Sequence, residues 1–187
     1  MRTLRIAATL LLAAASLSPA KGGERPISIG TNLLGYLYLG TINIDVGIGI
    51  DRHWSTHIRG NYNPFQWEVA SGVFQDKKLT VSAEGRYWPW HTLSGWFFGG
   101  GIQYQRYNRG GIFSPTASEG DAGGFTLSGG YALMLGRRVN LEFGAGVWGG
   151  YTKYREYQAP RCGKLIGQGY KFFILPNDLS ISAVFTF

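Results

Sequence analysis

The last nine residues of the chain alternate between apolar and polar side chains. The apolar positions share one parity: Leu179, Ile181, Ala183, Phe185 and Phe187. A period of two predicts a β-strand with one apolar and one polar face. The chain also ends on an aromatic residue, which is typical of the strand that closes an outer-membrane β-barrel. Phe185 and Phe187 are therefore candidates for the signal that the barrel-assembly machinery reads.

The amino terminus has the pattern of a secretory signal. Two arginines precede an apolar run at 6–17, and Ser18-Pro19-Ala20 places small residues where a signal peptidase cuts. The run of about a dozen apolar residues is too short to span a bilayer. We therefore expect a cleaved signal peptide at 1–20 and one domain at 21–187. If that domain spans a membrane, it must do so as a closed barrel, because lipid cannot satisfy unpaired backbone groups.

Eight segments have the composition of β-strands between turn signals. They are residues 27–34, 41–50, 54–63, 79–88, 95–107, 124–135, 139–154 and 178–187. Short connections at 51–53, 89–94 and 136–138 alternate with long ones at 64–78, 108–123 and 155–177. The connection at 35–40 is the short member of the second set. This pattern predicts an all-β fold, an eight-stranded antiparallel up-and-down transmembrane β-barrel with short periplasmic turns and longer extracellular loops.

Five charged residues in the middle of the predicted strands share the polar face. They are Asp45, Arg59, Glu84, Arg86 and Glu142. A lipid-facing arginine costs about 2–4 kcal/mol at the bilayer midplane, so this face must line the lumen. A soluble lipocalin-like barrel would have the opposite arrangement. Trp88, Phe97 and Trp148 share the lumen parity, and we expect the first and last to lie near strand ends or beside a bulge.

His57 joins these five charges on the lumen face. An eight-stranded barrel leaves an interior just wide enough for side chains to fill, so the charges must pair with one another. We expect a polar network that plugs the lumen without an open pore. The alternative is a proton relay or catalytic cluster that combines His57 with Glu84 or Glu142.

The sequence indicates no catalytic, cofactor-binding or metal-ligating residues. His53, His57 and His91 occupy separate segments, and no serine lies in a nucleophile elbow. No cofactor is expected. A lipid-modifying enzyme with a Ser–His site stays open as an alternative, because such a site forms only in space.

The segment 155–177 is rich in basic residues. Arg155, Arg161, Lys164 and Lys171 stand against Glu156 alone. These cations are candidates for contact with lipopolysaccharide phosphates, and the alternative is an ordinary solvated loop. Cys162 is the sole cysteine and cannot form an internal disulfide.

Several motifs occur in a fixed order along the chain. They are Thr31-Asn32-Leu33-Leu34, Gly60-Asn61-Tyr62-Asn63-Pro64-Phe65, Gly85-Arg86-Tyr87-Trp88, the segment 135–142, Lys153-Tyr154-x-x-Tyr157, and Cys162-Gly163-Lys164-x-Ile166-Gly167. Together they resemble the small outer-membrane barrel family catalogued as domain of unknown function 3575. The resemblance implies an eight-stranded outer-membrane barrel, often associated with surface or fimbrial gene sets, and no established activity.

The same resemblance bears on the cysteine. Family members often carry two cysteines, three residues apart, before the glycine of the last loop. Ala159 stands at the first of these positions here. This departure argues against a loop disulfide or a two-cysteine metal site.

The combined expectation is a non-enzymatic protein of the outer membrane of a Gram-negative bacterium. Its role would be structural or surface-binding, through the extracellular loops. The expected partners are outer-membrane lipids and lipopolysaccharide, the barrel-assembly machinery, and surface or fimbrial components, with no nucleic acid. The alternatives are a small outer-membrane lipid-modifying enzyme and a narrow porin.

Overall fold

The computed structural model describes residues 25–69, 72–111, 114–158 and 163–187. The predicted signal peptide lies outside the described residues. Strands make up most of the described chain, together with one short helix. In chain order the elements are β1 (Ile27–Asn32), α2 (Leu33–Leu37), β2 (Ile42–Gly49), β3 (Trp54–Asn63), β4 (Gln66–Val69), β5 (Gly72–Tyr87), β6 (Gly95–Gly111), β7 (Ser114–Met134), β8 (Val139–Gln158) and β9 (Leu165–Thr186).

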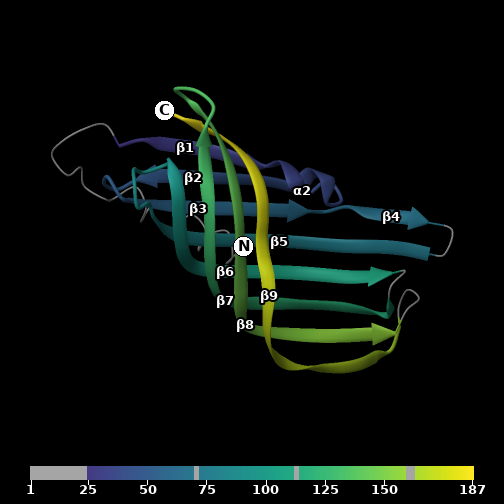
Figure 1. Ribbon diagram of the computed structural model, residues 1–187. Coiled ribbons are helices and arrows are strands. Elements are labelled where there is room, and N and C mark those ends of the chain that lie inside the picture. Colours follow the sequence, from purple (N-terminus) through teal and green to yellow (C-terminus); the bar gives the residue numbers. More distant parts are fainter. Residues whose placement is uncertain (1–24, 70–71, 112–113, 159–162) are drawn as a thin grey trace.

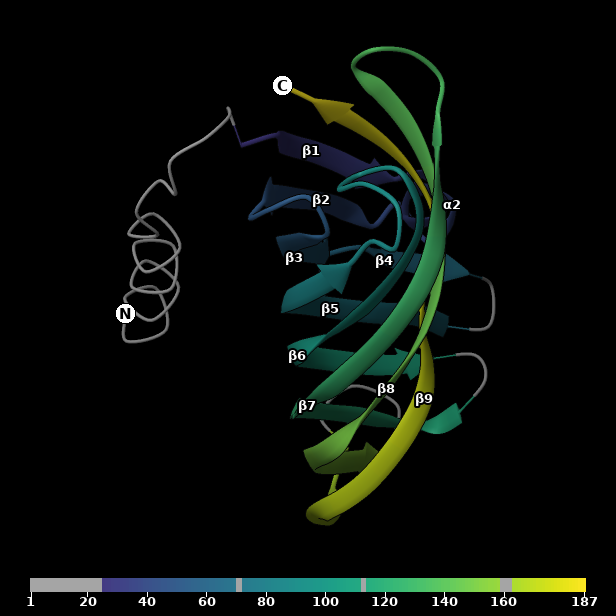
Figure 2. The ribbon, with the colours of Figure 1, turned by 60° about the vertical axis from the view of Figure 1, so that its left-hand side comes forward.

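Eight of the strands form a closed antiparallel ring (Figures 1 and 2). The ring consists of β1, β2, β3 and β5 to β9, and each of these strands pairs with the ring strands next to it in the chain. The short strand β4 lies outside the ring and pairs only with β5. The β3–β5 pairing bridges that insertion, and the β1–β9 pairing joins the first strand to the last. The predicted all-β architecture and its eight-stranded antiparallel order are confirmed.

The seam between β1 and β9 uses the alternating segment at the end of the chain. Ile29 lies opposite Phe185, and Thr31 opposite Ala183. The Phe187 N–H donates to the Ile27 carbonyl at 2.9 Å. The closing strand therefore leaves no free sheet edge at the seam between β1 and β9.

The three predicted long loops are largely strand instead, which corrects that part of the prediction. They are the segments 64–78, 108–123 and 155–177. The ladders continue there, for example from Gln75 to Gly110 and from Arg155 to Gln168. The alternation of apolar and polar residues stops earlier than the hydrogen bonds do, because both faces of a protruding hairpin contact water. Hydrophobic period alone cannot detect such a strand.

A β-bulge changes the facing of β9. Gly144 and Gly146 of β8 lie opposite Ser180 and Asn177, so β9 carries one extra residue at this point. Beyond the bulge, the Phe173 ring packs on Trp148 at 4.6 Å between ring centroids. Trp148 is buried in the middle of β8, not near a strand end, and the neighbouring bulge lies on β9.

The two ends of the ring are built differently. One end carries the short turns and the carboxyl terminus, and the other carries α2 and the strand hairpins, which extend to the right in Figure 1. At the short-turn end a small apolar core fills the interior: Trp88, Leu93, Phe97 and Ala132. Trp88 directly follows β5, so it does lie near a strand end.

The helix α2 takes the place of a hairpin between β1 and β2. The Asn32 side chain caps it by accepting from the Leu34 N–H at 3.0 Å. Asn32 also accepts from the Ile181 N–H at 3.2 Å, which ties the start of the helix to β9. In the described part of the chain, no helix combines the length and apolar character needed to cross a membrane.

Candidate functional site

Six titratable side chains from four strands meet inside the ring. They are Asp45, His57, Arg59, Glu84, Arg86 and Glu142. Strand register explains most of this convergence, since Asp45 lies opposite Arg59 and His57 lies opposite Glu84. Residues of one parity along neighbouring strands share a face. We call this set the interior cluster.

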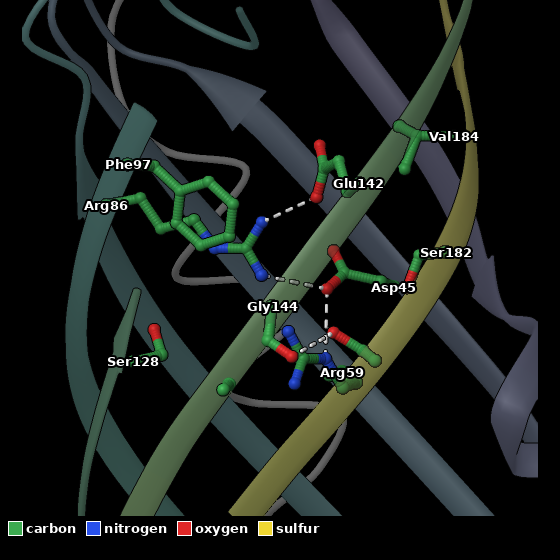
Figure 3. Close-up of a pocket in the computed structure, with 11 residues that line it drawn as sticks. Asp45, Arg59, Arg86, Phe97, Ser128, Glu142, Gly144, Ser182 and Val184 are labelled. Carbon is green, nitrogen blue, oxygen red and sulfur yellow. Dashed lines mark hydrogen bonds and ion pairs between the residues drawn. The ribbon is translucent and has the colours of Figure 1, made fainter. Parts of the chain in front are cut away.

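Arg86 stands at the centre of the interior cluster (Figure 3). Its Nε lies 2.6 Å from Glu84 Oε1, its Nη1 3.1 Å from Glu142 Oε2, and its Nη2 3.5 Å from Asp45 Oδ2. The Phe97 ring covers the guanidinium, with 4.6 Å between Cζ and the ring centroid. A planar guanidinium can serve several carboxylates at once, whereas a lysine ammonium lacks this geometry.

Asp45 connects Arg86 to the second half of the cluster. Its Oδ1 accepts from His57 Nδ1 at 2.8 Å, and its Oδ2 accepts from Arg59 Nε at 3.0 Å. Three cationic or imidazole groups therefore share one carboxylate. This pairing offsets the cost of removing the carboxylate from water.

Two glycines make room for the cluster. A Cβ on Gly47 would overlap the His57 ring and Ser28, and a Cβ on Gly99 would overlap the Glu84 carboxylate and Ser128. Both glycines face the interior, opposite a side chain of the cluster. The glycine content of the strands thus fits a narrow interior.

A chain of hydrogen bonds extends from the cluster to the short-turn end. Trp88 Nε1 donates to Ser55 Oγ at 2.8 Å, and Ser55 Oγ lies 3.0 Å from His57 Nε2. Since Asp45 accepts from His57 Nδ1, the Ser55 hydroxyl can donate to the other ring nitrogen. Sequence reasoning missed Ser55, although it lies two residues before His57 and so shares its face.

Ser55, His57 and Asp45 thus have the connectivity of a nucleophilic triad. Ser55 is 0 % exposed and His57 2 % exposed. The described cavities do not include Ser55 among their lining residues. The Ser55 oxygen is thus buried away from solvent, unlike the accessible nucleophile of a reaction centre.

The interior near Arg86 is closely filled. The cavity bordered by Arg86, Phe97 and Glu142 has a volume of about 20 Å³ (Figure 3). That volume is close to the space of a single water molecule. The short-turn end is sealed further by Asn140, whose side chain donates to the Leu93 carbonyl at 2.8 Å.

The other half of the interior is open. A cavity of about 520 Å³ extends from Asp45 and Arg59 to α2. Many of the residues that line it carry carboxamides or hydroxyls, including Gln103, Gln105 and Thr80. We call it the outer cavity.

A polar contact set lies at the rim of the outer cavity. Tyr38, just after α2, donates its hydroxyl to Asp76 Oδ2 at 2.7 Å, and Arg109 Nε donates to Asp76 Oδ1 at 2.8 Å. Lys78 Nζ lies 4.4 Å from the centre of the Tyr38 ring. These contacts connect the α2 segment to β5, although β2 and β3 lie between them in the order of the ring.

The rim contacts predict an alkaline transition. Burial, reinforced by the hydrogen bond to Asp76, raises the pKa of Tyr38 to about 12. The folded state holds this proton more tightly than the unfolded chain, so the contribution to stability is complete below pH 10 and is lost as pH rises toward 12. Near-ultraviolet titration of the wild type minus Tyr38→Phe should show one phenol with a midpoint near pH 12.

The Asp76→Asn variant provides the control. It keeps Lys78 and Arg109 beside the phenol and removes only the carboxylate charge. The difference titration should then shift toward the ordinary tyrosine value of 10.0. A Tyr38 midpoint at that value in the otherwise wild-type chain would contradict the prediction.

The basic residues predicted to meet lipopolysaccharide lie on the hairpin of β8 and β9. Arg155, Lys164 and Lys171 are exposed, and Arg155 Nη1 lies 3.9 Å from Glu119 Oε1. Arg161 and Cys162 lie outside the described residues. Contact with lipopolysaccharide stays a prediction.

The described residues contain no candidate metal-binding site. No group of three or more His, Cys, Asp or Glu side chains there has an arrangement that could hold a metal ion. The interior cluster pairs its carboxylates with guanidinium groups instead.

Comparison with known proteins assigns the chain to a family. The family model described as "Protein of unknown function (DUF3575)" matches residues 6–187. The chain belongs to this family. The resemblance predicted from the sequence motifs is thereby confirmed. A search of curated proteins finds no match to the chain.

Two motifs that carry the DUF3575 resemblance also build the interior cluster. The motif at 85–88 supplies Arg86, and the motif at 135–142 supplies Glu142. The family description names no activity. The function of this DUF3575 chain therefore has to be argued from its interior and its outer face.

Proposed function

We propose that this DUF3575 chain is an eight-stranded transmembrane β-barrel of the outer membrane, which acts at the cell surface in a non-enzymatic structural or binding role. The observation that carries the proposal is the inverted distribution of side chains. Among the described residues, 16 buried side chains are polar or charged and seven are apolar, while 40 large apolar side chains are exposed. In water such an exposed surface would promote aggregation, whereas lipid stabilises it.

The exposed apolar side chains form a belt around the ring. Outward-facing charged residues mark the border of this belt on the side of the strand hairpins. Arg106, Asp121 and Lys153 are register partners on β6, β7 and β8. Arg106 and Asp121 form an exposed ion pair at 2.9 Å, which suits the polar boundary of a membrane. Between this row and the short-turn end, outward positions such as Phe125 and Leu127 are apolar.

Aromatic pairs supply the lower border. Trp54 packs on Tyr87 at 5.2 Å, and Trp96 packs on Tyr131 at 5.3 Å between ring centroids. All four side chains are exposed and lie at the short-turn end of their strands. Aromatic girdles of this kind lie at the membrane interfaces of outer-membrane barrels.

The proposed orientation follows the lengths of the connections. The short turns, the start of β1 and the end of β9 would face the periplasm, and the strand hairpins would face outside. Phe185 and Phe187 pack together at 4.9 Å at the periplasmic end, where they would serve as the insertion signal for the barrel-assembly machinery. Lipopolysaccharide would be the partner of the exposed basic side chains, and surface or fimbrial components the partners of the hairpins.

The filled inner end favours this role over a porin. Trp88, Phe97 and Arg86 close the interior, and the space beside them is about 20 Å³. The lipid-modifying enzyme is favoured only by the Ser55–His57–Asp45 connectivity. The complete burial of Ser55 weighs against it.

Two measurements test the proposed function. The unheated protein should migrate differently from the boiled protein on a denaturing gel and should fractionate with outer membranes. Purified protein in a planar bilayer should give no steady unitary conductance. A soluble, heat-insensitive protein would overturn the membrane assignment, and large steady channels would overturn the plugged interior.

A further inference from the structure

The outer cavity has the size of a ligand site. Its volume is about 520 Å³, within the range of roughly 300–1,000 Å³ that small-molecule sites occupy. It reaches the surface beside Leu37, which is 83 % exposed. The interior cluster and Trp88 fill the other end of the ring, so the cavity is closed on that side.

Most of the residues that line it have uncharged polar side chains. They come from strands β3, β5, β6 and β9: Asn61, Thr80, Gln103, Gln105, Ser180 and Ser182. A carboxamide offers two N–H donors and a carbonyl acceptor, and a hydroxyl both donates and accepts. Such a wall is complementary to a ligand that carries several closely spaced groups, each able to donate and accept hydrogen bonds.

Several of these groups are available to a ligand. The Gln103 Oε1 accepts from Asn177 and the Gln105 Oε1 accepts from Thr80, each at 3.2 Å. The amide N–H groups of both glutamines donate to no group in the described residues, and the Asn61 side chain forms no hydrogen bond with them. These donors lie on β3 and β6, the two strands that flank β5, and they line one cavity.

Asn43 shows the contrast. Its Nδ2 donates to the Asn32 carbonyl at 3.0 Å, and its Oδ1 accepts from the Asn32 N–H at 2.5 Å. Both ends of this carboxamide therefore hold the β1–α2 junction in place. Asn43 belongs to the scaffold of the cavity, whereas Asn61, Gln103 and Gln105 form its recognition surface.

The charges that border the cavity are already matched within the protein. Asp45 at the floor contacts His57, Arg59 and Arg86. Lys78 at the rim lies 4.0 Å from Asp76. An ionic ligand would lose its hydration without gaining an unmatched opposite charge, so a neutral ligand fits the cavity better.

We propose that the outer cavity binds a small neutral, hydroxyl-rich molecule of one or two sugar units. Vicinal hydroxyls would pair with the carboxamides of Asn61, Gln103 and Gln105, and the apolar face of a sugar ring would pack against Tyr38 and Leu37 at the opening. This inference deepens the proposed surface function and rests on it, because the opening has to face the outside.

The test uses the full mature chain, folded in a zwitterionic detergent that carries no sugar headgroup. Saturation-transfer NMR is recorded with glucose, galactose, mannose, N-acetylglucosamine, maltose and lactose, each alone. At least one sugar should receive saturation from the protein. The double variant Gln103→Leu/Gln105→Leu should weaken its binding at least tenfold, and Asn61→Leu should weaken it in the same direction.

Gln75→Leu is the matched control. Gln75 is also a carboxamide on β5, but it pairs with Asn108 on the protruding hairpin and does not line the cavity. Its removal should leave sugar binding unchanged. Heat-modifiable migration of every variant on a gel shows that it has folded.

The outcomes separate the two proposals. Heat-modifiable protein that transfers saturation to none of the sugars overturns the inference and leaves the proposed function standing. Sugar binding that Gln75→Leu weakens as much as the cavity variants do, or preferential binding of acetate or phosphate, also overturns it. Failure of the wild type to show a heat-modifiable fold would instead overturn the proposed function.

Discussion

Replacing Arg86 by methionine should strongly destabilise the folded ring. The change leaves the Glu84 and Glu142 carboxylates buried without their shared cation, and it removes one of the contacts of Asp45. Breaking a buried ion pair in this way costs about 3–5 kcal/mol, against a total stability of roughly 5–15 kcal/mol for a typical domain. The heat-modifiable folded band of Arg86→Met should therefore be much weaker than that of the wild type.

Two further variants show whether charge is the cause. Adding Glu84→Gln and Glu142→Gln to Arg86→Met removes the uncompensated charges and should restore part of the folded band. Arg106→Met is the control, because the side chains of Arg106 and Asp121 are 63 % and 46 % exposed in their ion pair, and an exposed ion pair contributes about 0–1 kcal/mol. Normal folding of Arg86→Met alone would show that the cluster is not required.

An outward arginine should separate a membrane protein from a soluble one. Leu127 is 65 % exposed on β7, between the charged row and the aromatic pairs. In a bilayer, Leu127→Arg should cost about 2–4 kcal/mol, whereas an exposed substitution in a soluble protein changes stability by about 0.5 kcal/mol or less. Urea unfolding in phospholipid vesicles measures the difference.

Ile166→Arg serves as the matched control. Ile166 is 57 % exposed, similar to Leu127, but it lies at the hairpin end of β9, beyond the proposed belt. Its replacement should leave the unfolding midpoint nearly unchanged. Equal effects of the two substitutions would contradict the proposed position of the membrane.

The sequence was most informative where one strand face is apolar and the other polar. The segment 54–63 was predicted with the same bounds that β3 has in the structure. Parity alone also selected Asp45, Arg86 and Glu142, which meet inside the ring. In these strands a shift by one residue would move every side chain to the opposite face, so the pattern is strongly constrained.

The protruding hairpins and the cavity could not be predicted in this way. Strands β7 and β9 continue beyond the alternating segments, where water on both faces removes the periodic signal. The helix α2 begins at Leu33, inside the segment 27–34, which the apolar composition predicts to be one strand. The bulge opposite Gly144 and the hydrogen bond from Ser55 to His57 depend on register between strands, which a single sequence does not contain.

The unequal strand lengths described above give the molecule a low side and a high side. β1 has six residues and β2 eight, whereas β7, β8 and β9 have 21, 20 and 22. In the proposed orientation, the wall stands far above the membrane on one flank and ends close to it at α2 on the other. A small neutral sugar would reach the outer cavity over this low side, so the strand lengths would set the direction of its approach.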